Sequence, residues 1–183
     1  MDAETDTLAG LASEMLEAEP ANLAWDLEWE LSPFNWIRTE PSASTRGRLG
    51  AALVSRWCAA EGFPATPAPT AHADRVVKGH RVEIKLSTLW EQGVYAFQQF
   101  RDQDFDVAFC LGLSPLVAHG WLIPKPVLLE HVIGHEGQHT GKSAADTFWL
   151  KFDPTQPPEW LAAYGGGLAV VRTLLQQLPQ GPF

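Results

Sequence analysis

The sequence predicts an α/β (α+β) protein in which a mixed central β-sheet is flanked by helices. Short runs rich in Val, Ile and Phe, typical of strands, are interspersed with segments whose apolar residues recur every three to four positions, as in amphipathic helices. Such an order of elements builds a sheet with helices on its faces. With 183 residues, 45% of them hydrophobic, and eight tryptophans, the chain is long enough for one domain with a buried core.

Charge divides the chain into an acidic, Trp-rich extension, residues 1–40, and a single globular domain, residues 41–183. The extension holds ten acidic residues and one basic residue, whereas the domain holds twelve of each. Within the domain, residues 46–85 carry seven basic and three acidic residues, a net charge of +4. Because the local field steers a polyanion, the overall charge of −9 does not exclude DNA as a partner.

The extension contains two segments with apolar patterns. Residues 4–18 are predicted to form an amphipathic helix. In residues 23–37 tryptophan and leucine nearly alternate with polar residues, which indicates either a strand or an irregular arm laid over the core. Large exposed aromatic side chains are costly, so this segment is expected to be buried on the domain or on a partner.

The domain is predicted to begin with a helix over residues 46–61, capped by Ser44 or Thr45. Its apolar residues share one face, and its arginines lie near another. Arg46 and Arg48 are therefore candidates for contacts with DNA phosphates, with solvated surface charges as the alternative.

A β-hairpin is predicted around Lys78-Gly79, a dipeptide suited to a two-residue turn. With this turn the numbers of facing residues sum to 157, so that Asp74 faces Glu83. Successive side chains alternate between the faces of a strand, which places Lys85 on the same face as the two carboxylates. The opposite face is apolar and carries Val77, Val82, Ile84 and Leu86.

The remaining elements follow from continuous apolar runs, helical spacing and breaker residues. Residues 64–71, with three prolines, are predicted to be a loop that leads into the hairpin. In chain order the later elements are a helix at 90–101, strands at 106–112 and 117–123, a short helix at 125–133, a strand at 147–152, and a helix at 168–178 introduced by three glycines.

The facing carboxylates of Asp74 and Glu83 indicate a cation site. Directly opposed Cβ atoms are roughly 4.5–5.5 Å apart, so both carboxylates can reach one ion, and without an ion they repel each other. Mg²⁺ takes one or two carboxylates together with water and phosphate oxygens. The alternative is a surface hairpin whose charges form solvated ion pairs, worth about 0–1 kcal/mol.

An aspartate followed by Glu-x-Lys on paired strands resembles the PD-(D/E)xK nuclease superfamily, which includes many restriction endonucleases. Ala73 stands where the superfamily often has proline. The resemblance covers about residues 46–155 and implies a restriction-endonuclease-like core. It further implies that Asp74, Glu83 and the carbonyl of Ile84 bind Mg²⁺, with Mn²⁺ as an alternative. Lys85 would position the attacking water, and cleavage of DNA would leave a 5′-phosphate and a 3′-hydroxyl.

Further candidates for DNA contacts lie after the hairpin. In several families of this superfamily a glutamine on the helix after Glu-x-Lys supports the site, and either Gln98 or Gln99 would be its equivalent. Arg101 follows on the same segment. A later polar loop carries His139 and Lys142, which suit phosphate or base-edge contacts.

A competing motif is present in residues 135–139, where His135, Glu136 and His139 match the HExxH signature of zinc proteases. That chemistry needs both histidines on one face of a stable helix. Three glycines lie between residues 134 and 141, and each costs about 1 kcal/mol in a helix interior. A zinc-dependent hydrolase is therefore retained only as an alternative.

The expected function is a Mg²⁺-dependent DNA endonuclease of the restriction or phage-defence type. A DNA repair or recombination nuclease of the same fold would share the site, and a catalytically idle DNA-binding subunit would keep the fold without the activity. A homodimer is also expected, because many restriction-type nucleases cut duplex DNA as dimers. Two cysteines without a CxxC motif, no export signal and no long apolar run predict a cytoplasmic protein without a membrane span.

Overall fold

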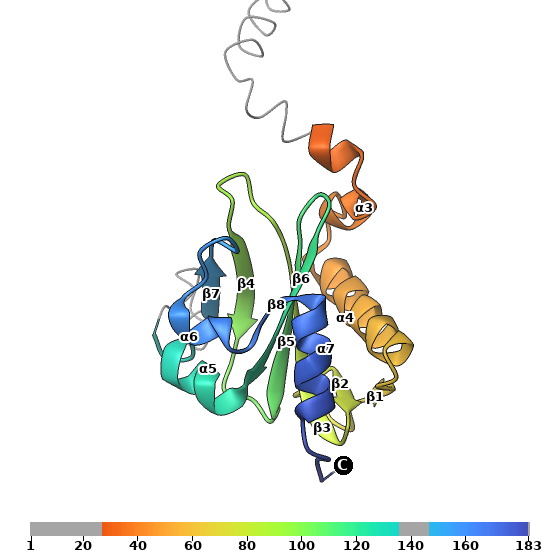
Figure 1. Ribbon diagram of the computed structural model, residues 1–183, viewed down its shortest axis with the longest axis vertical. Helices are drawn as coiled ribbons and strands as arrows, with labels where there is room; N and C mark the ends of the chain where they lie inside the picture. The colour runs from red at the N-terminus through yellow and green to blue at the C-terminus, as the bar shows by residue number, and fades with distance from the viewer. Residues whose placement is uncertain (1–26, 136–146, 183) are drawn as a thin grey trace, which may run out of the picture.

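The structure, a computed structural model, describes residues 27–135 and 147–182. Its centre is a six-stranded sheet in the order β1-β2-β3-β5-β6-β8 (Figure 1). Only the β3–β5 pair is parallel among the strands of this sheet, so the sheet is mixed, as predicted. The strands are β1 (Ala65–Pro67), β2 (Arg75–Val77), β3 (His80–Thr88), β5 (Val107–Leu113), β6 (Ala118–Pro124) and β8 (Gly165–Gly167).

Each face of the sheet is covered by a separate apolar cluster. On one face pack α3 (Asn35–Arg38), α4 (Ala43–Ala60) and α7 (Leu168–Gln177), with Val54 and Val171 buried against the sheet. On the other face lies a second, two-stranded sheet of β4 (Tyr95–Phe100) and β7 (Phe148–Phe152), together with α5 (Lys125–His131) and α6 (Glu159–Ala162). The prediction of a sheet flanked by helices is confirmed.

β5 shows why a continuous apolar run is needed at the centre. Its residues alternate between the two clusters, with Ala108 and Cys110 on the side of β4 and β7 and Phe109 and Leu111 on the side of α4. All seven of its residues are buried. A strand covered on both faces cannot alternate apolar with polar residues, and the predicted buried strand at 106–112 is confirmed.

Residues 90–101 do not form the helix that their spacing predicts. They form a turn at residues 90–94 followed by β4. Val94, Tyr95 and Phe97 favour strands, and Gly93 adopts a left-handed conformation with φ of 73° that ends helical geometry. Pairing with β7, which begins more than 40 residues later, therefore prevails over the helical spacing of the aromatic residues.

Other boundaries differ by less. Residues 65–67 of the predicted loop form the edge strand β1, and the three glycines before the last helix form β8. The first domain helix begins at Ala43, and its cap is Ser42, whose hydroxyl accepts a hydrogen bond from the Thr45 N–H at 3.2 Å. The other predicted strands and helices agree with β6, α5, β7 and α7 within about two residues.

The part of the extension that the structure describes is helical and turn-like, so the strand alternative is wrong for residues 27–37, and residues 23–26 lie outside the described residues. Trp29 and Ile37 are buried, the latter in the same apolar cluster as α4. Leu31 and Trp36 remain exposed, with exposed fractions of 84% and 59%. The predicted helix at 4–18 lies outside the described residues.

The hairpin turn also anchors the end of the chain. The Lys78 ammonium donates to the last carbonyls of α7, those of Leu175 at 2.9 Å and Gln176 at 3.1 Å, and to that of Leu178. A cation at a helix C-terminus satisfies carbonyls that have no partner within the helix and opposes the helix dipole. The carbonyl of Lys78 in turn accepts from the Gly181 N–H at 2.8 Å.

Replacing Lys78 with methionine is expected to lower the free energy of unfolding by about 1–2 kcal/mol, because the carbonyls at the end of α7 lose their cation. Urea unfolding followed by circular dichroism measures the change. Arg48→Met serves as the control, since Arg48 is exposed on α4. Equal stability of the two variants would contradict the proposed role of Lys78 as a cap.

Candidate active site

The hairpin has the register that the sequence predicts. Arg75 pairs with Val82, Val76 with Arg81, and Val77 with His80. The apolar face is buried against the α4 side of the sheet, with exposed fractions of 3% for Val77 and 2% for Val82. The side chains of the opposite face, which include Glu83, are therefore directed away from that core.

Asp74 lies just before β2 and is held against β3 by its backbone and its side chain. Its N–H donates to the carbonyl of Val82 at 3.0 Å. Its carboxylate Oδ2 accepts from the N–H of Ile84 at 2.7 Å. The aspartate is thus positioned beside the Glu83–Ile84 peptide, although by these bonds and not by a strand pair at position 74.

Glu83 and Lys85 form an ion pair that is largely withdrawn from solvent. The Lys85 Nζ lies 2.6 Å from the Glu83 Oε1, and each side chain is 15% exposed. Nζ also donates to the backbone carbonyl of Gln99 at 3.0 Å and lies 5.6 Å from the centre of the Phe100 ring. Three contacts therefore fix the ammonium, and two of them come from β4.

The environment raises the pKa of Glu83 above its ordinary value. Burial is the largest cause, because it penalises the ionised carboxyl. Lys85 acts in the opposite direction, the negative charge of Asp74 raises the pKa further, and Arg101 lowers it. The carboxylates of Asp74 and Glu83 are therefore close enough to repel each other, which a cation between them would reverse.

The donor set fits a hard divalent cation better than zinc. Asp74 and Glu83 offer carboxylate oxygens, and the carbonyl of Ile84 is nearby in the chain. Mg²⁺ is satisfied by one or two carboxylates because it retains several waters. Zinc sites are built from three or four His, Cys or carboxylate ligands, and within residues 27–135 and 147–182 no three such side chains form a group that could hold a metal.

A bulge in β4 turns the Gln99 carbonyl toward Lys85. The register between β4 and β7 shifts between Phe97 and Phe100. Gln99 has a φ of 60°, a left-handed conformation that is uncommon for residues other than glycine. Bulges of this kind redirect groups of a strand, and here the redirected group is a hydrogen-bond acceptor for the lysine.

Lys85 reaches a groove of about 690 Å³ between the sheet and the beginning of α4. The middle of β3 and the bulge of β4 line one part of it, and α3 and α4 line the other. Its charged lining residues are Arg38, Arg46 and Lys85, and in the part of the chain that the structure describes no aspartate or glutamate lines it. In a chain with a net charge of −9, a groove whose charged lining is cationic is suited to a polyanion.

The structure places the other predicted contact residues as follows. Arg46, Gln98 and Gln99 line the groove, whereas Arg48 is exposed on α4 outside it. The charge of Arg101 acts on Glu83, which places it near the carboxylates. His139, Lys142 and Glu136 of the zinc motif lie outside the described residues. α5 ends at His131, so His135 does not continue that helix.

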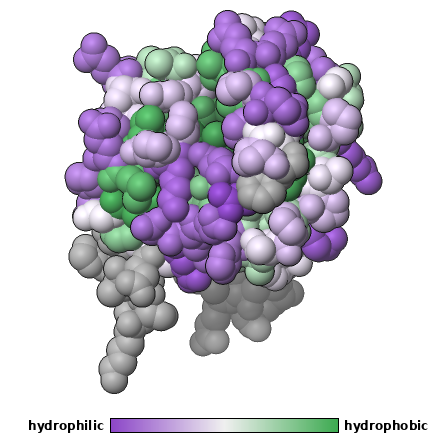
Figure 2. Space-filling model, turned by 90° about the horizontal axis from the view of Figure 1, so that it is seen from below, coloured by the Kyte–Doolittle hydropathy of each residue, from purple (hydrophilic) through white to green (hydrophobic). Residues whose placement is uncertain are grey.

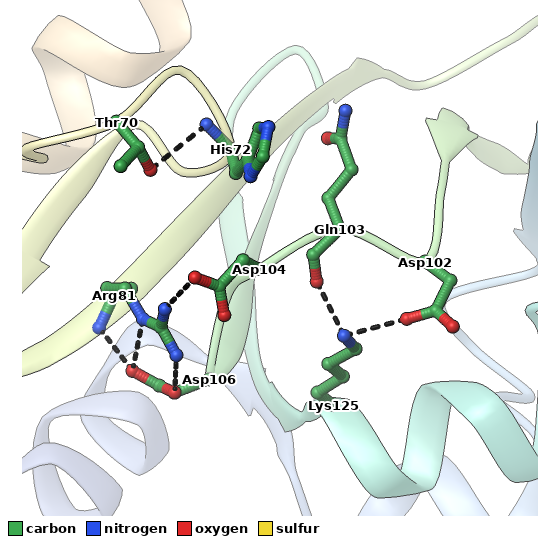
Figure 3. A network of polar contacts seen from close by, with 8 residues as sticks. All are labelled: Thr70, His72, Arg81, Asp102, Gln103, Asp104, Asp106 and Lys125. Atoms are coloured by element: carbon green, nitrogen blue, oxygen red, sulfur yellow. Dashed lines mark hydrogen bonds and ion pairs between the residues drawn. The ribbon is translucent and has the colours of Figure 1, made fainter.

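A second polar network fixes the end of the sheet at which β3 and β5 begin, the lower end in Figure 1 (Figure 3). The Arg81 guanidinium binds the Asp106 carboxylate at 2.8 Å and also pairs with Asp104. The Arg81 N–H donates to the same Asp106 carboxylate at 2.7 Å. Beside it, Lys125 pairs with Asp102 at 2.7 Å. These contacts tie the beginning of β3 to the beginning of β5.

The network lowers the pKa of Asp106, chiefly because the Arg81 side chain donates hydrogen bonds to the ionised carboxylate. Viewed from the lower end, hydrophilic side chains cross the middle of the surface (Figure 2). Each acid of this network is paired with Arg81 or Lys125, and the pairs fix the strand that carries Glu83 and Lys85.

Arg38 and Trp90 are among the groove residues that were not predicted from the sequence. Arg38 is the one basic residue of the acidic extension. The net charge of the extension did not indicate that this residue could contact DNA. Trp90 begins the predicted helix at residues 90–101, which does not form. Its place in the groove follows from the turn at residues 90–94.

No family model and no curated protein matches the chain. Seven solved chains match in structure, among them the bacterial homing endonuclease I-Ssp6803I, with 15% sequence identity and a TM-score of 0.48 over 74% of this chain and 95% of that one. A likeness this distant does not assign an activity. Within the described residues, no helix combines the length and apolar character needed to cross a bilayer.

Proposed function

We propose that the protein is a metal-dependent DNA endonuclease of the PD-(D/E)xK type. The observation that carries this proposal is the combination of Lys85 with its groove. The lysine is paired with Glu83 and lines a groove that two arginines also line, and the Asp74 carboxylate is held by the N–H of the neighbouring Ile84. DNA binding depends on cations that meet phosphates, and phosphodiester hydrolysis needs positive charge near the reacting phosphate.

Each residue of the site would have a distinct role. Asp74, Glu83 and the Ile84 carbonyl would hold Mg²⁺, which supplies a Lewis acid and lowers the pKa of a bound water. Lys85 would orient the attacking water and neutralise the charge that grows on the phosphate, for which its ammonium is already fixed by Glu83 and the Gln99 carbonyl. Arg38 and Arg46 would hold neighbouring phosphates. The products would carry a 5′-phosphate and a 3′-hydroxyl.

Cleavage of supercoiled plasmid tests the proposal. The full chain is incubated with plasmid in Mg²⁺, in Mn²⁺ and in EDTA, and nicked and linear products are separated on gels. Cleavage with either metal and none in EDTA is the expected result. Absence of cleavage under all three conditions, with plasmid and with circular single-stranded DNA alike, would leave only an idle DNA-binding subunit. Cleavage that survives in Lys85→Ala but is lost in Glu136→Gln would indicate the zinc hydrolase instead.

Cleavage is expected to decline on the acid side at a higher pH than an ordinary glutamate would give. Only ionised Glu83 can hold the cation, and its pKa is raised above the usual 4.5, chiefly by burial. As the pH falls through the raised pKa, protons displace the metal, so the Mg²⁺ concentration for half-maximal rate rises. Rates measured against pH at several Mg²⁺ concentrations show this competition.

The same carboxyl gives a stability effect of predictable sign. Because its pKa is higher in the folded protein than in the unfolded chain, the folded protein binds this proton more tightly. Its contribution to stability is present below the ordinary pKa and is lost as the pH rises through the raised pKa. Mg²⁺ is therefore expected to raise the melting temperature at pH values above the raised pKa of Glu83. It is not expected to raise it at pH values below the ordinary pKa of a glutamate. A pH-independent response to Mg²⁺ would contradict Glu83 as a ligand.

The proposal also includes a role in the cell. Restriction of foreign DNA or defence against phage is the setting that the PD-(D/E)xK resemblance favours, and DNA repair or recombination would use the same site. Phage plating on cells with and without the protein tests the first setting. Sensitivity to DNA-damaging agents in a deletion strain tests the second. Sedimentation with and without DNA tests the proposed homodimer.

A further inference from the structure

A tryptophan lies where the cationic groove continues into a second hollow. Trp90, Arg38 and Thr88 line the groove of about 690 Å³, and the same three residues line an adjoining hollow of about 260 Å³. The two hollows therefore adjoin at Trp90 and Arg38, and Glu91 also lines the second one, so the cationic path of a strand ends at the indole ring. A chain-like ligand that passes Lys85 along the groove would reach the indole ring next.

Trp90 is held in place through both its backbone and its ring. Its backbone N–H donates to the Val94 carbonyl, and its carbonyl accepts from the Gly93 N–H, both at 2.9 Å. Trp149 packs edge to face with the ring at a centroid distance of 6.2 Å, and the Lys151 Nζ lies 5.3 Å from the ring centre. A half-buried ring that is already fixed loses little conformational entropy when a ligand packs on it.

Burial of the reactive groups limits the form of DNA that can use them. Lys85, which lines the groove, is 15% exposed, as is its partner Glu83, so the scissile phosphate must enter the groove to reach the ammonium. A duplex keeps its bases stacked inside and cannot bring a base to a protein ring without unpairing it. A single strand can follow a groove lined by cations while its bases stack on aromatic side chains.

We propose that the groove binds an unpaired DNA strand, with one base stacked on Trp90 and its phosphates near Arg38 and Arg46. Lys151, which is exposed and whose ammonium lies over the ring, moves from the ring face to a phosphate of the same strand when the base stacks. This inference rests on the proposed nuclease function and adds the substrate class, which is single-stranded DNA or the single-stranded part of a branched or mismatched duplex.

Fluorescence anisotropy tests the inference with the full chain in EDTA, where binding is measured apart from cleavage. The probes are a fluorescein-labelled oligothymidylate, which forms no duplex, and a blunt duplex of the same length and label. The oligothymidylate is expected to bind more tightly at the same salt concentration. Trp90→Ala should weaken its affinity roughly 5- to 150-fold, the loss of one base–aromatic stack, and should hardly change duplex binding.

Two further variants separate stacking from a general effect on folding. Trp90→Phe retains an aromatic face and should recover most of the affinity. Trp36→Ala removes a tryptophan that is 59% exposed and does not line the groove, and it should bind both probes as the wild type does. Circular dichroism melting identifies any variant that is not folded.

The outcomes distinguish this inference from the proposed function. Equal affinity for the two probes, or equal effects of Trp90→Ala and Trp36→Ala, would overturn the stacking site even if plasmid is cleaved in Mg²⁺. Selective binding of the oligothymidylate through Trp90 would support the site even if no cleavage is found, in which case the nuclease proposal alone fails.

Discussion

Replacing Lys85 with alanine is expected to lower the rate of DNA cleavage by about 10²- to 10³-fold while DNA is still bound. The ammonium is fixed beside the carboxylates, by Glu83 at 2.6 Å and the Gln99 carbonyl at 3.0 Å. Without it, charge that grows on the phosphate is no longer neutralised, and the proposed water loses its orienting donor. Single-turnover cleavage of plasmid measures the rate, and anisotropy measures the affinity.

A matched control is Lys125→Ala. Lys125 also forms a close ion pair, with Asp102 at 2.7 Å, but it lies in the network at the lower end of the sheet. This variant is expected to cleave at nearly the wild-type rate. If both lysine variants lose activity equally, loss of an ion pair rather than loss of a catalytic ammonium explains the result. If Lys85→Ala cleaves normally, the nuclease site has been assigned to the wrong residue.

Replacing Asp74 with asparagine is expected to abolish the response to Mg²⁺ and to reduce cleavage by about 10²- to 10³-fold. Metal stabilisation of a phosphoryl oxygen supplies several kcal/mol, and about 1.4 kcal/mol corresponds to a tenfold change in rate. The amide oxygen can still accept the hydrogen bond from the Ile84 N–H, so the fold should persist. Cleavage across a Mg²⁺ titration measures the first effect.

The same substitution has a second readout that does not depend on activity. The charge of Asp74 raises the pKa of Glu83, so its removal should lower that pKa. Carbon-13 NMR of the labelled glutamate carboxyl follows the titration. Asp104→Asn is the control, because Asp104 pairs with Arg81 and is 58% exposed. An unchanged Glu83 titration in Asp74→Asn would show that the two carboxylates do not interact.

The hairpin could be predicted from the sequence because local rules determine it. Lys78-Gly79 fixes the turn, both residues adopt positive φ, and the turn fixes the register of every pair that follows. The apolar face of Val77 and Val82 then determines which side is buried. For these reasons the turn position and the alternation of side chains were enough to predict Glu83 and Lys85 on the opposite face.

The partner of Lys85 could not be predicted in the same way. Its acceptor is a backbone carbonyl at a bulge, which carries no residue signature, and the bulge exists only because β4 pairs with β7. The spacing of Trp90, Val94 and Phe97 is compatible with a helix, and only a contact distant in sequence excludes it. The groove residues Arg38 and Trp90 were missed for the same reason, since long-range packing brings them to β3.

The pairing of β4 with β7 affects when the contacts of Lys85 form during synthesis of the chain. β3 ends at Thr88, whereas β7, the strand that pairs with β4, begins only at Phe148. Contacts so far apart along the chain form late. On a ribosome, the nascent polypeptide would expose its hairpin long before the Gln99 carbonyl is fixed. The lysine would thus acquire its final orientation only after residues 148–152 have been made, which delays any hydrolytic capability well beyond synthesis of the hairpin.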